Sequence, residues 1–177
     1  MKSITGTCLH RGVSCAIVVA AIGLAAFSEG TPQRYENAEF GFSLTVPERF
    51  REGNTKDPRH GRLWVSEDGQ ARLIAVATRN EAGMSLSDYR AFVIEQTYKG
   101  AEFDHSPVRS TWFVLTGRVG SQEFYERITF ACGGRYIYGW QMLYPVSSRK
   151  TYDRIVEAVH RSFRAGRGED GNCGRSQ

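Results

Sequence analysis

Few residues of this 177-residue sequence have the type and spacing that chemistry requires. Beyond residue 28, the three histidines, His60, His105 and His160, and the two cysteines, Cys132 and Cys173, are too scattered to predict a metal site, so we expect neither a metal nor another cofactor. His160 falls on the polar side of an expected helix, where a solvated side chain is the usual outcome. The sequence has no G-x-S-x-G turn around a nucleophile and no phosphate-binding loop. One carboxylate and one aromatic surface remain as candidates.

The carboxylate is Glu126, which we expect on an otherwise apolar face of a β-sheet. Gly120-Ser121 and Gly133-Gly134 are typical of two-residue turns, which fix the pairing of the three strands that they join. In that pairing, Leu115 and Gln141 flank Glu126. A buried carboxyl group has a raised pKa and can act as an acid or a base, so one hypothesis is a small cell-envelope hydrolase using Glu126. The alternative is a position at the rim or an ion pair with an arginine.

The aromatic surface lies on the opposite face of the same three strands. Arg127 is expected opposite Trp140, where a guanidinium group could stack on the indole ring. If this face is open, it suits a sugar, a ring-bearing ligand or a protein partner. If a helix or the N-terminal segment covers it, it is a second core. The candidate ligand-binding residues are Trp112, Tyr125, Arg127, Tyr138 and Trp140.

The elements that position these residues follow from hydrophobic periodicity. Alternating or β-rich runs predict strands at 40–46, 62–67, 70–78, 112–118, 122–131 and 135–144, and apolar stripes at helical spacing predict helices at about 85–98 and 147–163. Strands joined by such short turns are antiparallel. The fold class is therefore α+β, with an antiparallel sheet, made of a hairpin plus a three-strand meander, packed by two amphipathic helices. Residues 29–38 are expected as a polar lead-in and 48–61 as a charged loop.

The N-terminus is typical of an export signal. Lys2 and Arg11 precede a 13-residue apolar run at 15–27, which is short of the roughly 20 residues that a membrane span needs. We predict a signal peptide at 1–28, a single domain at 29–164 and a flexible Gly-rich tail at 165–177. The expected location is periplasmic or secreted, with no membrane span once the signal is removed. An uncleaved N-terminal anchor is the alternative.

Charge and cysteine content agree with export. Removing residues 1–28 takes away two basic residues and no acidic one, which lowers the net charge from +4 to +2. With no long Lys/Arg cluster, we expect no nucleic-acid partner. Exactly one cysteine pair then remains, Cys132 and Cys173, and an oxidising compartment favours a disulfide between them. An intermolecular bridge and two free thiols are the alternatives.

Several stretches carry a family resemblance: Y-E-N-A-E-F-G-F at 35–42, L-T-V-P at 44–47, W-F-V-L-T-G at 112–117, and Y-P at 144–145 leading to Y-D-R-I-V at 152–156 and S-F at 162–163. Together they resemble small exported proteobacterial proteins of uncharacterised function. Those proteins are similar in outline to the PsbP-like α/β/α sandwich, which also contains a Ran-binding protein. The resemblance spans 35–163 and implies that sandwich. Its motifs are structural and imply no catalytic residue.

The resemblance and the residues together favour a non-enzymatic binding or accessory module of the periplasm or cell envelope, with a protein or small-molecule partner. The hydrolase using Glu126 and a purely structural envelope protein are the alternatives. An enzyme requires a pocket with convergent polar groups near Glu126, whereas a binding module requires an accessible patch.

Overall fold

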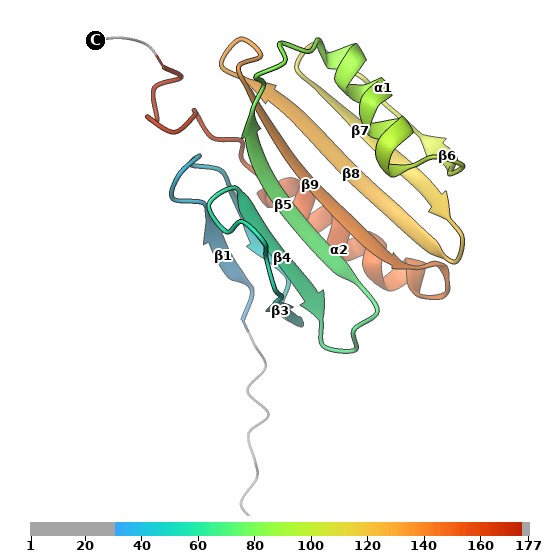
Figure 1. Cartoon of the computed structure of the whole chain (residues 1–177). Coiled ribbons are helices and arrows are strands. Elements are labelled where there is room, and N and C mark those ends of the chain that lie inside the picture. The colour runs from blue at the N-terminus through green and yellow to red at the C-terminus, as the bar shows by residue number, and fades with distance from the viewer. Residues whose placement is uncertain (1–30, 175–177) are drawn as a thin grey trace, which may run out of the picture.

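The computed structural model describes residues 31–174 as a seven-stranded antiparallel sheet with a helix on each face and a separate two-stranded sheet (Figure 1). The strand order in the large sheet is β3-β4-β5-β9-β8-β7-β6, and β1 pairs with β2. The predicted signal peptide lies outside the described residues. The elements are β1 (Gln33–Glu36), β2 (Ser43–Val46), β3 (Phe50–Glu52), β4 (Gly61–Ser66), β5 (Arg72–Arg79), α1 (Leu86–Thr97), β6 (Glu102–His105), β7 (Trp112–Val119), β8 (Gln122–Ala131), β9 (Tyr136–Pro145), a short 3-10 turn (Val146–Ser148) and α2 (Arg149–Ser162).

The predicted pairing of the central strands is confirmed. Leu115 and Gln141 flank Glu126, and Arg127 lies opposite Trp140. The β4–β5 hairpin likewise has the register that a turn at 68–69 imposes. The α+β fold class predicted from the sequence is therefore correct.

The sheet has one core on each face. Under α1, Phe113, Leu115, Phe124, Ile128 and Ile137 are buried. The other face carries Tyr138, Trp140 and Met142, which pack with β1–β2 and α2 in a larger cluster. Figure 1 shows α2 behind the sheet and α1 in front of it.

The two helices differ in how well they match their predicted apolar stripes. α2 buries Tyr152, Val156 and Val159, which lie at helical spacing on its apolar stripe. In α1, helical spacing places Phe92 and Val93 on one apolar stripe, but only Val93 is buried and Phe92 is 45% exposed. Ser85 caps α1, because its hydroxyl accepts a hydrogen bond from the backbone N–H of Asp88 in the first turn. Among residues 31–174, neither helix is long and apolar enough to cross a membrane.

Three short strands were not predicted from the sequence. β1 lies in the expected polar lead-in, β3 in the expected charged loop, and β6 at the opposite edge of the sheet. Each has three or four residues, so alternation along the chain is too brief to distinguish a strand from a loop. All four residues of β6 are exposed. These edges depend on pairing with a neighbour rather than on their own pattern.

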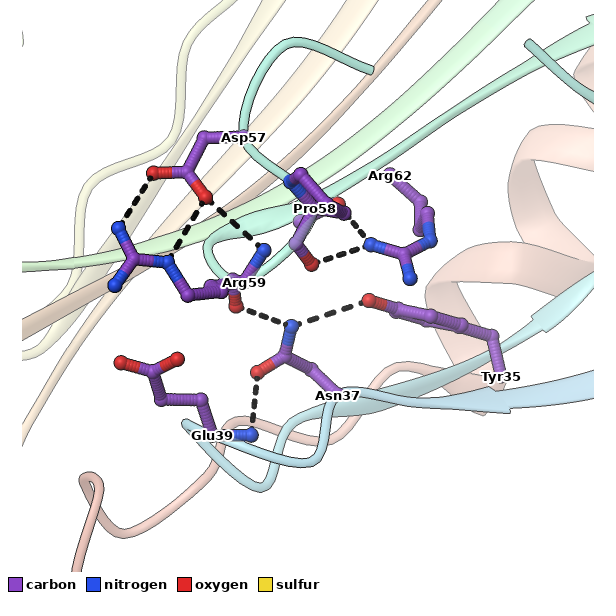
Figure 2. A network of polar contacts seen from close by, with 8 residues as sticks. Tyr35, Asn37, Glu39, Asp57, Pro58, Arg59 and Arg62 are labelled. Atoms are coloured by element: carbon purple, nitrogen blue, oxygen red, sulfur yellow. Dashed lines mark hydrogen bonds and ion pairs between the residues drawn. The ribbon is translucent and has the colours of Figure 1, made fainter. Parts of the chain in front are cut away.

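A buried asparagine fastens β1–β2 to the loop before β4 (Figure 2). Asn37 is 3% exposed, and its amide nitrogen donates hydrogen bonds to the Tyr35 hydroxyl at 3.1 Å and the Arg59 carbonyl at 2.8 Å. Its side-chain oxygen accepts from the backbone N–H groups of Glu39 and Phe40. One side chain thus closes the β1–β2 turn and anchors it to a segment 22 residues away.

The segment after α2 is held against the sheet. Cys132 and Cys173 form the predicted disulfide. The backbone N–H of Gly168 donates to the buried Tyr138 hydroxyl at 2.8 Å. The described part of the segment predicted as a flexible tail, through residue 174, therefore has fixed partners. Composition alone missed this, because glycine-rich sequence says nothing about the anchors that surround it.

Candidate functional site

Two of the five candidate ligand-binding residues are core residues. Tyr138 is 0% exposed and Trp140 is 1% exposed, because α2 and β1–β2 cover the face on which they lie. For these two positions, the hypothesis of an open aromatic surface is wrong and the alternative of a second core is correct. The covering elements come from distant parts of the chain, so strand register alone could not decide between the two.

The other three candidates lie on the same face of the sheet, beside α2, where the helix no longer covers the strands completely. Trp112, Tyr125 and Arg127 are partly exposed. The Tyr125 ring stacks on Trp140, with centroids 4.8 Å apart and planes inclined by 22°. The predicted cation–π contact of Arg127 exists, but its partner is different: the guanidinium carbon lies 4.7 Å from the centroid of the Trp112 ring.

His160 joins this group, contrary to the expectation that it is solvated. It is partly buried, and its Nδ1 lies 2.6 Å from the Tyr125 hydroxyl. Its Nε2 lies 3.1 Å from Nη1 of Arg127. The sequence held a signal that we did not use. His160 follows Val156 by four residues and precedes Phe163 by three, so it borders the apolar stripe of α2.

These contacts fix the protonation of His160. A guanidinium group only donates, so Nε2 accepts from Arg127 and the ring proton is on Nδ1, which donates to the Tyr125 hydroxyl. Burial, and next the charge of Arg127, lowers the pKa of His160 below its ordinary value of 6.5. Burial also raises the pKa of Tyr125 to about 12. At neutral pH, Arg127 therefore supplies the positive charge of the group.

Arg127 has no carboxylate counterion among residues 31–174. Besides its contacts with Trp112 and His160, it donates a long hydrogen bond from Nε to the Thr129 hydroxyl at 3.5 Å. Burial lowers the pKa of Arg127 below its ordinary value, because the charged form is partly removed from water. A second guanidinium, that of Arg109, lies 5.8 Å from the Trp112 ring. We call Trp112, Tyr125, Arg127 and His160 the Arg127 cluster.

A hollow of about 260 Å³ adjoins the Arg127 cluster, since Tyr125 lines both. Its acidic groups have a partner: Arg149 contacts the buried Glu123 at 3.5 Å and Asp153 at 3.5 Å. Strand pairing places Glu123 opposite Arg118, but the Arg118 guanidinium pairs with Glu102 at 2.8 Å instead. The lining is acidic overall, because Asp104, Glu123, Asp153 and Glu157 outnumber Arg149, whereas the Arg127 cluster carries no carboxylate.

Glu126 lies on the other face of the sheet, under α1. Its Oε2 is buried without a hydrogen-bond partner. Burial raises its pKa from 4.5 to about 7, and the neighbouring Tyr98 hydroxyl partly offsets this effect. That hydroxyl accepts a hydrogen bond from Gln141 at 2.5 Å.

Glu126 does not line any of the five best-formed surface hollows among residues 31–174, whose volumes are 260–480 Å³. Nor does that part of the chain contain a group of three or more His, Cys, Asp or Glu side chains arranged to hold a metal ion.

Comparison with known proteins identifies the fold. Seventeen chains of solved structures match. Cyanobacterial PsbP from Synechocystis superposes with a TM-score of 0.60 at 16% identity, covering 90% of this chain and 98% of that one. The Ran-binding protein Mog1p of Saccharomyces cerevisiae superposes with a TM-score of 0.55 at 10% identity, covering 77% and 96%. No family model and no curated protein matches the sequence. The fold is thus PsbP-like, as the resemblance implied, and identities this low indicate no more than the fold.

Proposed function

We propose that this chain is an exported, non-enzymatic binding or accessory module that recognises an anionic group of its partner at the Arg127 cluster. The observation that carries the proposal is Arg127 itself. It is partly buried, lies over an indole ring and has no carboxylate partner in residues 31–174.

The physical argument is that a desolvated cation has lost water without gaining a counterion. A carboxylate or phosphate group placed on Arg127 forms charge-assisted hydrogen bonds, which are the stronger class in proteins. Trp112 adds a flat apolar surface beside the charge, so an anion attached to a ring or to an apolar side chain suits the site best. An accessory role agrees with the PsbP-like fold, since the yeast neighbour is described as a Ran-binding protein.

Export rests on the N-terminal sequence. Cell fractionation with N-terminal sequencing tests it, and we expect a mature protein that begins near residue 29 outside the cytoplasm. Recovery of protein with an intact Met1 from the cytosol contradicts export and leaves the Arg127 cluster untouched as a binding site.

Partner recognition is tested by capture from a periplasmic extract with three tagged proteins: wild type, Arg127→Gln and Arg72→Gln. Arg72 is an exposed arginine whose strand neighbour Leu73 points into the core with Trp140, so it projects from the opposite face. We expect a partner that wild type and Arg72→Gln retain and Arg127→Gln loses. Retention of the same proteins by all three contradicts the proposed site.

A further inference from the structure

A second hollow differs from the acidic one beside the Arg127 cluster, because its lining is largely apolar. It has a volume of about 460 Å³ and lies between α2 and the β2–β3 connection. This volume falls within the range of small-molecule sites. Phe50, 5% exposed, and Val159, 1% exposed, are among the core residues that line it. The lining residues are Pro32, Thr45, Pro47, Glu48, Arg49, Phe50, Arg154, Ile155, Ala158, Val159 and Ser162.

The walls of this groove are apolar, and their own polar groups are largely satisfied. The Thr45 backbone N–H donates to the Ser162 hydroxyl at 2.9 Å, and that hydroxyl donates to the Val159 carbonyl at 2.9 Å. Ala158, a small and exposed residue of α2, leaves the groove open on the helix side. A hydrocarbon chain can therefore displace water from the groove without leaving polar atoms that lack a hydrogen-bond partner.

The charges at the groove are unbalanced. Arg49 comes from the β2–β3 side and Arg154 from α2, so each wall contributes one guanidinium group. Neither forms an ion pair among residues 31–174, and Glu48 is the single acidic residue of the lining. An apolar channel with an arginine on each wall is complementary to a hydrocarbon chain that ends in an anion.

We infer that this groove binds a free fatty acid of medium chain length. The hydrocarbon chain lies on Phe50, Ile155 and Val159, and the carboxylate binds between Arg49 and Arg154. The inference is independent of the Arg127 cluster, because the two sites share no residue.

Calorimetric titration of the purified protein with decanoate tests the inference, with decyltrimethylammonium as a probe of equal chain length and opposite charge. We expect saturable binding of decanoate and much weaker binding of the cation. Shortening the chain should weaken binding about two- to fourfold for each methylene removed, according to how fully the chain is buried. Equal affinity for the two head groups, or no saturable binding of decanoate, overturns the inference.

Variants locate the site. Arg49→Gln and Arg154→Gln should each weaken decanoate binding about fivefold or more, while Arg161→Gln, on the same helix but outside the groove, should not. Ala158→Phe should block the groove, whereas Ala91→Phe, at an exposed position of α1, should bind normally. Thermal unfolding of each variant confirms that it is folded. Unchanged affinity in a folded Ala158→Phe overturns the inference.

Discussion

Glu126 makes the stability of this protein depend on pH in a direction opposite to that of an ordinary carboxylate. Its carboxyl group is buried under α1, and burial raises its pKa from 4.5 to about 7. Between these two pH values the folded chain retains a proton that the unfolded chain releases. The free energy of unfolding therefore falls as pH rises from 4.5 to 7 and is constant, as far as Glu126 is concerned, above that.

The magnitude follows from the same two values. Each pKa unit corresponds to about 1.4 kcal/mol, so the shift from 4.5 to about 7 corresponds to about 3 kcal/mol of lost stability above pH 7. Glu126→Gln keeps the shape of the protonated acid and cannot ionise. The variant should therefore match wild type near pH 4 and exceed its stability by up to about 3 kcal/mol near pH 8, less any cost of placing the extra amide donors.

Urea unfolding measured at several pH values between 4 and 8 gives the required free energies. Glu95→Gln, an exposed glutamate of α1, is the matched control and should follow the wild-type pH dependence. Parallel pH curves for wild type and Glu126→Gln would refute the reasoning, since they would mean that Glu126 titrates normally in the fold.

Two further variants and one measurement on the disulfide test the core and its anchors. Trp140→Ala should destabilise the fold by about 3–5 kcal/mol in thermal or urea unfolding, and an unchanged midpoint would place the indole outside the core. Asn37→Ala should lower the free energy of unfolding by about 1–3 kcal/mol, because the hydrogen-bond partners of this side chain are left unpaired. A loss of stability near zero would contradict the anchoring role of Asn37. Mass spectrometry of the non-reduced protein should show Cys132 and Cys173 protected from alkylation, and reduction should cost up to about 4 kcal/mol in the chain-entropy model. Alkylation of both without prior reduction contradicts the bond.

The central strands could be predicted from sequence because two turns determine their register. Once Gly120-Ser121 and Gly133-Gly134 are identified as turns, the cross-strand neighbours of Glu126 and Arg127 follow by counting, and the structure has the same neighbours. The turn glycines Gly133 and Gly134 have φ values of +67° and +87°, which residues with a side chain rarely adopt.

The features that were not predicted depend on packing between segments that are distant in the sequence. The position of α2 on the sheet decides whether Trp140 is covered. It also decides whether Glu123 pairs with Arg118 or with Arg149. His160 was missed for the same reason: its neighbours on β8 are more than 30 residues away in sequence. Local patterns predict elements and register, but they do not predict which element lies over which face.

The central claim is that the Arg127 cluster holds an anionic group, and NMR titration of the protein with benzoate, a carboxylate attached to a ring, tests it most directly. The account predicts saturable shifts at the Trp112 indole N–H and the Arg127 Nε–H, and a rise in the pKa of His160 toward 6.5 as the bound anion offsets the charge of Arg127. Arg127→Gln should abolish these shifts. Small non-saturating shifts at many exposed arginines, with an unchanged pKa of His160, would contradict the claim.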